Sequence, residues 1–412
     1  MISDKIRALA AECEEELINE FKLYDDISRT NTEKVLSVFR ELQLADRHFA
    51  PTNGYGYNDD GRDLADAAFA KAFGCESGFV RHSIVSGTHA LGIGLFALLR
   101  PGDTLFSVAG KPYDTLDGVI GIGDAREAGC LAEFGVKYKQ HELVQGKTLD
   151  YDGIIEEIKA DSSIKVVFVQ RSKGYLNRES LSSKEITKLY GMVKEMSDAF
   201  VVVDNCYGEF CETEEPVADL LIGSLIKNPG GGIAETGAYL VGTKTAVELA
   251  AARLTVPGIG LECGASLGHT RSILKGLFFA PHVVCQAKKT AAFAAMLFSK
   301  LGYAVNPLPG EQRRDIIQTV SMGSAEGVCA FCRGIQKGSP VDSFVTPEPW
   351  DMPGYSDAVI MAAGAFTQGS SLELSADAPI RPPYTVFMQG GLTYESGRYG
   401  IMLAAEECAQ IR

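Results

Sequence analysis

The sequence predicts an α/β protein, with a three-layer α/β/α domain around a mainly parallel sheet and a smaller α+β domain after it. First, helical patterns alternate with short apolar strands from about residue 63, which is typical of a parallel sheet covered on both faces. Second, a chain of 412 residues is too long for one simple core. Third, short segments punctuated by Pro and Gly follow Gly302, and we assign them to the smaller domain.

The first fifty residues are expected to be helical. Apolar residues recur on one helical face, and a second run of the same pattern follows a capping signal at Thr32. A loop rich in Gly, Asn and Tyr comes next, with the sequence PTNGYGYNDDGRD. The two apolar runs are Ile6, Leu9, Cys13, Leu17 and Phe21, and then Val35, Phe39 and Leu42.

Five apolar segments are expected to form strands: SIVS near residue 83, TLFSV near 104, KVVFVQ near 165, FVVVD near 200 and AYLVG near 238. Helical patterns such as THALGIGLFALL and SKEITKLYGMVKEM lie between them, and the second opens with the capping-box spacing of Ser182 and Glu185. A long apolar helix, HVVCQAKKTAAFAAMLFSKLG, ends the series. We therefore divide the chain into a helical segment (1–50), a major domain (51–285) and a smaller C-terminal domain (286–412).

Composition and charge argue against several classes of protein. The net charge is −14, from 39 basic and 53 acidic side chains, which disfavours nucleic-acid and anionic-membrane partners. No run of 18 apolar residues occurs and the acidic, amphipathic N-terminus is not a signal peptide, so we expect a cytoplasmic protein. Ten scattered cysteines do not indicate a disulfide framework. Cys329 and Cys332 lack the further ligands of a zinc site, and we interpret them as reduced thiols.

Lys227 ends the apolar run LLIGSLIK and is followed at once by Asn, Pro and three glycines. Most lysines at such a point begin a solvated loop. Alternatively, the amine lies at the edge of a dry pocket, where burial and cationic neighbours let it lose its proton and react with an aldehyde. The glycines at 230–232 would then let the backbone approach a bound group.

Asp204 directly follows the apolar run AFVVV, so its carboxylate is expected at the carboxyl end of a buried strand. Ligands bind at that edge in open α/β sheets. The carboxylate either holds a cationic nitrogen of a ligand or caps the next turn, and its position alone does not decide between these roles. Lys227 lies 23 residues later (227 − 204), which allows one excursion back to the same edge.

The segment VSGTHALGIG indicates a phosphate-binding site. A strand is expected to end at Ser86, and Gly87 and Thr88 then open a helix whose first N–H groups and dipole favour an anion. The segment is neither a Walker loop nor G-x-G-x-x-G, so the signal is weak by itself. We interpret His89 as a helix-start residue rather than a general base. The hydroxyl of Ser224 either reaches the phosphate or bonds the backbone.

Tyr113, in GKPYDT, follows the next strand at the same edge, where its ring either stacks on a heterocycle or is half-buried in the first helical turn. A phosphate seat, an aromatic ring, a strand-end carboxylate and a lysine are together what pyridoxal 5′-phosphate (PLP) requires. We therefore expect PLP as the cofactor. A dinucleotide would not need the lysine, and a metal would need more carboxylates or histidines.

With these residues in place, the sequence resembles the fold-type-I PLP enzymes of the cystathionine/methionine γ-lyase group, and within it the bacterial aluminium-resistance proteins. The resemblance covers nearly the whole chain and is most specific in NGYGYNDDGRD, SGTHAL, VVVDNCYGEF and SLIKNPGGGIAETGAYLVG. It implies a PLP-dependent carbon–sulfur lyase that eliminates a thiol from a sulfur-containing amino acid. The alternatives are a γ-replacement enzyme, an aminotransferase, or a non-catalytic protein that binds a phosphorylated ligand.

The resemblance also implies roles for individual residues. Lys227 would bind the cofactor aldehyde and then move the Cα proton, Asp204 would hold the pyridine nitrogen, and Tyr113 would stack on the ring. Tyr113 or Tyr57 would protonate the departing sulfur. The cofactor phosphate is assigned to Ser86, Gly87, Thr88 and Ser224.

Tyr55 or Tyr57 matches a tyrosine that the wider group sends from a neighbouring subunit into the phosphate site. The resemblance therefore implies a homo-oligomer, with a dimer that shares its active sites, within a tetramer. Arg381 is assigned to the substrate carboxylate together with Tyr57, and Arg398 and Arg171 are its alternatives. The chain departs from the wider group where QRSKGY replaces a Ser/Pro-Asn-Pro segment, and where an isoleucine precedes the lysine.

Overall fold

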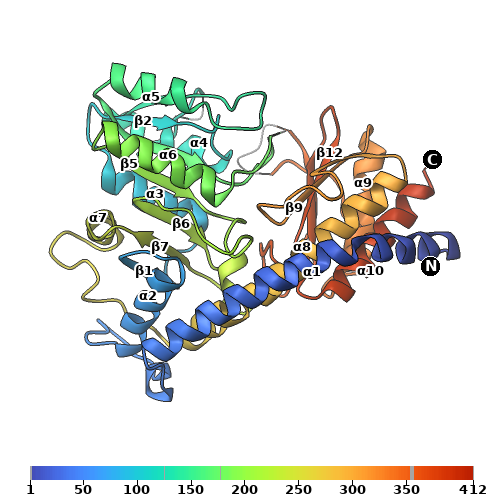
Figure 1. Cartoon of the computed structure of the whole chain (residues 1–412), viewed down its shortest axis with the longest axis horizontal. Coiled ribbons are helices and arrows are strands. Elements are labelled where there is room, and N and C mark those ends of the chain that lie inside the picture. Colours follow the sequence, from blue (N-terminus) through green and yellow to red (C-terminus); the bar gives the residue numbers. More distant parts are fainter. Residues whose placement is uncertain (1, 125, 177, 353–356, 412) are drawn as a thin grey trace.

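The computed structural model describes residues 2–124, 126–176, 178–352 and 357–411, and it contains two β-sheets joined by two long helices (Figure 1). The seven-stranded sheet lies in the first part of the chain and the five-stranded sheet in the last part. Both chain ends lie at the end of the molecule that carries the five-stranded sheet (Figure 1). None of the described helices is long and apolar enough to cross a membrane.

The seven-stranded sheet has the strand order β1-β7-β6-β5-β4-β2-β3. Neighbouring strands are parallel except around β7, which runs antiparallel to both β1 and β6. The sheet is therefore mainly parallel, as the sequence predicts. Its strands are β1 Ser77–Arg81, β2 Thr104–Ser107, β3 Lys137–Gln140, β4 Ile164–Gln170, β5 Phe200–Asp204, β6 Leu220–Ser224 and β7 Ala238–Gly242.

Helices cover both faces of this sheet. One face packs against α2 Asp60–Ala72, α5 Tyr151–Ala160 and α6 Ser183–Met196, and the other against α3 Gly87–Leu98, α4 Thr115–Ile120 and α7 Lys244–Leu254. Successive valines of β5 point into the two opposite cores, which is why a strand buried on both faces has an unbroken apolar sequence. The capping box at Ser182 and Glu185 begins α6 as predicted. Three 3-10 turns complete this part: η1 Asp46–Phe49, η2 Leu131–Phe134 and η3 Asn228–Gly230.

The five-stranded sheet is antiparallel throughout, in the order β10-β11-β12-β9-β8. Two helices, α9 Ala325–Lys337 and α10 Tyr394–Ala409, pack with it in a separate hydrophobic core. This part has the α+β architecture that the sequence predicts, and Cys329 and Cys332 lie on α9. Its strands are β8 Ala304–Asn306, β9 Ile317–Ser321, β10 Val359–Ala362, β11 Ser375–Pro379 and β12 Thr385–Gln389.

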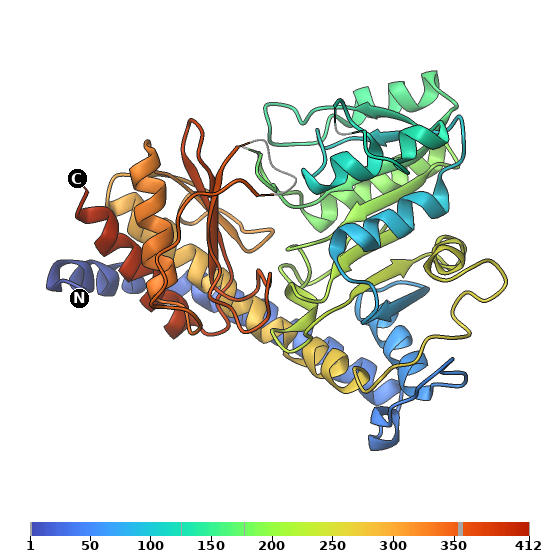
Figure 2. The ribbon, with the colours of Figure 1, turned by 180° about the vertical axis from the view of Figure 1, so that it is seen from behind.

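Helices α1 (Asp4–Glu41) and α8 (Thr270–Lys300) run side by side from the five-stranded sheet to the seven-stranded sheet (Figures 1 and 2). The first half of α1 packs in the core of the five-stranded sheet, whereas Val35 and Val38 near its other end belong to a core of the seven-stranded sheet. Because α8 also contributes to both cores, the two helices tie the sheets into one body.

Three sequence predictions about elements are wrong. Thr32 does not begin a second helix, because α1 is continuous and the Thr32 hydroxyl donates to the Ser28 carbonyl within it, at 2.8 Å. The segment 83–86 is not a strand, since the edge strand β1 has already ended at Arg81 and Val85 is 73% exposed. Helix α8 begins at Thr270, well before the predicted start, and carries Pro281 inside it.

Candidate active site

A pocket of about 220 Å³ lies at the carboxyl ends of β4, β5 and β6. These strands are parallel neighbours, so the residues that follow them meet at one edge of the sheet. The pocket brings together seven of the residues that the sequence singled out. They are Ser86, Gly87, Thr88, Tyr113, Asp204, Ser224 and Lys227.

Lys227 lies three residues beyond the end of β6 and is partly buried. Its Nζ atom is 4.3 Å from the centroid of the Tyr207 ring. Burial works against the ammonium form, but the neighbouring Cys206, Tyr207 and Asp204 act in the opposite direction, and the pKa of Lys227 is raised. The expectation that cationic neighbours would help this amine lose its proton is therefore wrong, since the groups that face it favour the charged form.

Asp204 is the last residue of β5, and only 6% of it is exposed. One carboxylate oxygen accepts a hydrogen bond from the backbone N–H of Cys206 at 3.1 Å, so the side chain supports the turn after the strand. The carboxylate also lines the pocket. Burial raises its pKa, while the nearby Lys227 ammonium works in the opposite direction. The Asp204 carboxylate therefore caps the turn and lines the pocket at the same time.

The start of α3 forms another wall of the pocket. The Ser86 hydroxyl caps the helix by accepting from the His89 N–H at 3.0 Å, which leaves the first helical amides at Gly87 and Thr88 without intrahelical acceptors. A Cβ atom on Gly87 would lie 3.5 Å from the Cβ of Ser224, so these residues are in contact across the pocket. The Ser224 hydroxyl is buried and has no hydrogen-bond partner within the described part of the chain. An anion at this helix end would satisfy it.

Tyr113 lies in the turn that leads into α4, where its carbonyl accepts from the Leu116 N–H at 2.8 Å. Its ring lines the pocket and packs against Tyr175 with a centroid distance of 5.6 Å. Gly174, with a φ of +55°, allows this approach, because a Cβ there would lie 3.2 Å from the Tyr113 ring. The ring is therefore a wall of the pocket held by its neighbours.

The glycines at 230–232 do not face this pocket, contrary to the sequence interpretation. A Cβ on Gly231 would lie 2.3 Å from the carbonyl oxygen of Gly276 in α8, and one on Gly232 would lie 2.4 Å from Leu392. Both residues have positive φ angles. Gly231 allows the end of η3 to pack closely on α8, and Gly232 leaves room for Leu392, so both contacts fix the segment that follows Lys227.

Sequence reasoning did not assign a site role to several residues that line the pocket, among them Gln170, Gly174, Cys206 and Tyr207. Gln170 ends β4 beside β5, so the strand-end rule that identified Asp204 applies equally to it. Tyr207 adopts a φ of +73°, which is unusual for a residue other than glycine and turns the chain sharply after β5. Only the structure reveals that this turn brings the Tyr207 ring to Lys227.

The two exposed tyrosines do not line the pocket of their own chain. Tyr55 and Tyr57 are 72% and 60% exposed, and their rings stack on each other at 5.5 Å in the loop after η1. Arg381 does not line this pocket either, but it lines a neighbouring cavity. Arg171 is fully buried against Glu212 and Glu215, and Arg398 binds Glu14 of α1, so neither reaches the pocket.

The mainly parallel seven-stranded sheet, the antiparallel second sheet and the strand-end pocket define the α/β fold of the fold-type-I PLP enzymes. The same fold occurs in the Escherichia coli protein YhfS, which is described as pyridoxal-5′-phosphate dependent. That chain is 12% identical with a TM-score of 0.62, over 93% of this chain and 96% of the other, a likeness of fold alone.

The chain belongs to the methionine gamma-lyase family, whose model matches residues 6–409. A crystal structure described as a carbon-sulfur lyase involved in aluminum resistance, from Clostridium novyi NT, is 47% identical with a TM-score of 0.95. The match covers 100% of this chain and 97% of that one. The Bacillus subtilis (strain 168) protein YnbB, which is described as uncharacterized, is 47% identical over 409 residues, covering 98% of this chain and 97% of YnbB.

Proposed function

We propose that the protein is a PLP-dependent carbon–sulfur lyase, which eliminates a thiol from a sulfur-containing amino acid and releases a 2-oxo acid and ammonia. The observation that carries the proposal is the Lys227 amine and the Asp204 carboxylate in one pocket beside the start of α3. Membership of the methionine gamma-lyase family supports the reaction class. The description of the Clostridium novyi relative as a carbon-sulfur lyase supports it further.

The residues present fit this cofactor. The unpartnered Ser224 hydroxyl and the first amides of α3 suit a phosphate, and the Tyr113 ring suits an aromatic ring. Asp204 suits a pyridine nitrogen, because a buried carboxylate favours a positive charge beside it. When bound, PLP condenses with amines and accepts the electron pair released at the α-carbon of an amino acid.

The side chains of this chain would supply the proton transfers. Lys227 would hold the cofactor and then take the proton from the α-carbon of the substrate, and Tyr113 or Tyr57 would donate a proton to the departing sulfur. Asp204 would keep positive charge at the ring nitrogen throughout. Arg381, from the neighbouring cavity, and Tyr57 would contact the substrate.

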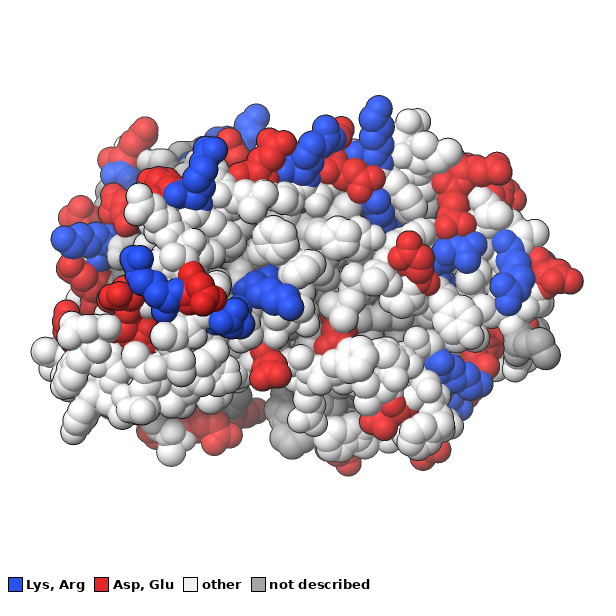
Figure 3. Space-filling view, turned by 90° about the horizontal axis from the view of Figure 1, so that it is seen from below, with Lys and Arg blue, Asp and Glu red and all other residues white. Residues whose placement is uncertain are grey.

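We further propose that two copies of the chain share their active sites, within a tetramer. Tyr55 and Tyr57 are strongly exposed and do not line the Lys227 pocket of their own chain, which suits aromatic side chains that contact a second copy. Figure 3 shows one face of the molecule, on which uncharged side chains surround scattered charged ones.

Borohydride reduction of the PLP-loaded protein tests the covalent attachment. The peptide that carries Lys227 should acquire the pyridoxyl label, and a Lys227→Ala protein should acquire none. Lys111→Met is the matched control, because Lys111 is a nearby lysine that pairs with Asp117 and does not line the pocket. A label that persists in Lys227→Ala contradicts the assignment.

A panel of sulfur amino acids tests the reaction. Formation of keto acid and thiol in equal amounts, without a second amino acid, is the expected result for elimination. A strict requirement for a thiol acceptor indicates γ-replacement, and a requirement for a 2-oxo acid acceptor indicates transamination. Binding of PLP without turnover of any member of the panel contradicts the proposed lyase activity.

A further inference from the structure

Glu209 is a fully buried glutamate close to the Lys227 pocket, and no step of the proposed reaction uses it. It belongs to the turn that follows β5. Its carboxyl lies against β6, since a Cβ atom on Gly223 would lie 2.4 Å from the Glu209 Oε1 atom. Gly223 directly precedes Ser224, which lines the pocket. The acid is therefore packed on the strand that leads to Lys227.

The backbone of the same turn is bound to the residue that follows Lys227. The side-chain amide of Asn228 donates to the carbonyl of Glu209 at 2.9 Å and to the carbonyl of Tyr207 at 3.0 Å. Asn228 is fully buried, and the Tyr207 ring faces the Lys227 amine. A shift of the turn at 207–209 would therefore displace both the segment that carries Lys227 and the ring that faces its amine.

A series of buried side chains connects Glu209 to the end of β5. Its Oε1 atom accepts from the Tyr239 hydroxyl of β7 at 3.0 Å, and this hydroxyl accepts from the Asn205 amide at 3.2 Å. The side-chain oxygen of Asn205 accepts from the Arg171 guanidinium at 2.7 Å. Because Asn205 directly follows Asp204, the same hydrogen bonds hold the strand-end carboxylate of the pocket in place.

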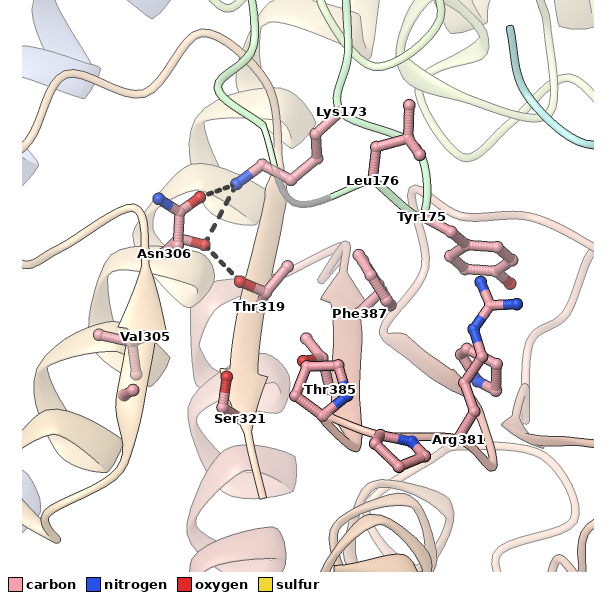
Figure 4. Close-up of a pocket in the computed structure, with 14 residues that line it drawn as sticks. Lys173, Tyr175, Leu176, Val305, Asn306, Thr319, Ser321, Arg381, Thr385 and Phe387 are labelled. Atoms are coloured by element: carbon pink, nitrogen blue, oxygen red, sulfur yellow. Dashed lines mark hydrogen bonds between the residues drawn. The ribbon is translucent and has the colours of Figure 1, made fainter. Parts of the chain in front are cut away.

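No cation is paired with the Glu209 carboxyl within the part of the chain that the structure describes. Its Oε2 atom is buried and has no hydrogen-bond partner there. Two cations that follow β4 are bound elsewhere, Arg171 to two other glutamates and Lys173 to Asn306 (Figure 4). A buried carboxylate without a paired cation is costly, so burial favours the uncharged acid.

The groups around Glu209 act on its charge in both directions. Burial raises the pKa of Glu209 to about 8, and the charge of Glu215 acts in the same direction. The hydrogen bond from Tyr239 and the charge of Lys227 oppose this rise. The Cys206 thiol, in the same turn, is close enough for the Glu209 charge to act on it. Glu209 is therefore mainly neutral at pH 7 and becomes charged as the pH rises through 8.

We propose that Glu209 is a positioning residue for Lys227 and that it acts as an uncharged acid. Its hydrogen bonds hold the turn after β5 against β6, and its neutrality keeps a further negative charge away from the Lys227 amine. The groups that face this amine already favour the ammonium form, so an ionised Glu209 would leave less free amine to react. This role rests on the proposed function of Lys227 as the reacting amine.

Competitive acetylation of the full-length protein with acetic anhydride, measured at the Lys227 peptide by mass spectrometry, tests this role without a cofactor. Glu209→Gln keeps a neutral group of the same shape and an acceptor for Tyr239, so at pH 7 Lys227 should react within about twofold of the wild-type rate. From pH 7 to pH 9 the ratio of the variant rate to the wild-type rate should rise about threefold or more, because only the wild type gains a charge. Glu214→Gln, at an exposed glutamate a few residues further along, is the matched control, and its ratio should stay constant.

Attachment of PLP to Lys227, followed by visible absorption at pH 7, tests the hydrogen bonds. Glu209→Leu, which cannot accept from Tyr239, should slow attachment about tenfold or more, whereas Glu209→Gln should change it little. A Glu209→Gln ratio that stays constant from pH 7 to 9, or a Glu209→Gln protein as slow as Glu209→Leu, overturns the proposal. A Lys227 amine that is acetylated in none of the proteins also overturns it.

The two measurements separate this proposal from the proposed function. Failure of PLP to attach to the wild-type protein would contradict the proposed function alone, because acetylation still reports how Glu209 acts on Lys227. If Glu209→Leu does not fold, the pH dependence of Glu209→Gln decides the matter by itself.

Discussion

Lys173 is a buried base whose charge costs the folded protein stability. Burial is the main cause that lowers its pKa from the ordinary 10.5 to about 8, while Asp315 partly opposes this effect. At pH values between these two pKa values, the unfolded chain binds a proton at Lys173 that the folded chain does not bind. At neutral pH both forms are protonated, and keeping the charged amine buried lowers the free energy of unfolding by about 3 kcal/mol. The stability of the wild-type protein should therefore rise as the pH increases from 8 to 10.5.

Lys173→Met keeps an unbranched side chain of similar length and removes the charge. The variant loses the hydrogen bonds to Asn306, which contribute about 1–2 kcal/mol together. The net expectation is a gain of about 1–2 kcal/mol in the free energy of unfolding at pH 7. Above pH 10.5 the gain should disappear and the variant should be slightly less stable than the wild type, because only the lost hydrogen bonds then remain.

Urea denaturation of both proteins at several pH values between 7 and 11 measures this difference. Lys159→Met, an exposed lysine on α5, is the control and should change stability little at any pH. A Lys173→Met protein that is less stable than the wild type at pH 7, by an amount that does not vary with pH, would refute the reasoning.

Three further predictions follow from other sites. Asp204→Asn should lower kcat of the PLP-loaded enzyme on the order of 100-fold, because Asp204 lines the pocket. The exposed control Asp198→Asn should leave kcat unchanged. Equal kcat values for Asp204→Asn and the wild type in steady-state assays would contradict the role of Asp204. Gly276→Ala should destabilise the protein by about 2–3 kcal/mol in urea, because its Cβ would lie 2.4 Å from the Gly230 carbonyl oxygen. Gly191→Ala in α6, with open space around its Cβ, should instead stabilise it by about 0.5–1 kcal/mol. Burial opposes the charge on His141, but Glu157 and Asp150 outweigh burial and raise its pKa, so its contribution to stability is full below pH 6.5 and is lost as the pH rises through the folded pKa. The stability deficit of His141→Gln should follow the same pH dependence, and a deficit that is constant from pH 5 to 9 would argue against it.

The sequence predicted the site residues best where a strand-end residue or a helix cap depends on nearby residues alone. Asp204 ends a buried parallel strand, so a general rule for α/β sheets was enough to predict its place at the carboxyl edge, and the spacing of 23 residues was enough to expect Lys227 at the same edge. The strand β6 that ends at Ser224 was not among the predicted strands. The capping signal at Ser182 was similarly reliable because it depends on residues three positions apart.

The failures have a different physical cause. The strand β3 lies at the edge of the sheet and has the polar sequence KYKQ, so no apolar pattern in the sequence predicts it. The glycines at 230–232 serve contacts with α8 and with Leu392, which come from distant parts of the chain. Residues 172–175 likewise lie between the Lys227 pocket and the five-stranded sheet, and no local pattern encodes that contact.

The position of α1 has a consequence for synthesis of the protein on the ribosome. The apolar stripe from Ile2 to Tyr24 has its packing partners between residues 285 and 408. A growing chain must therefore carry that stripe uncovered until nearly all of its codons have been translated. Nascent chains stalled before residue 285 should accordingly recruit chaperones at their first helix, and full-length chains should release them.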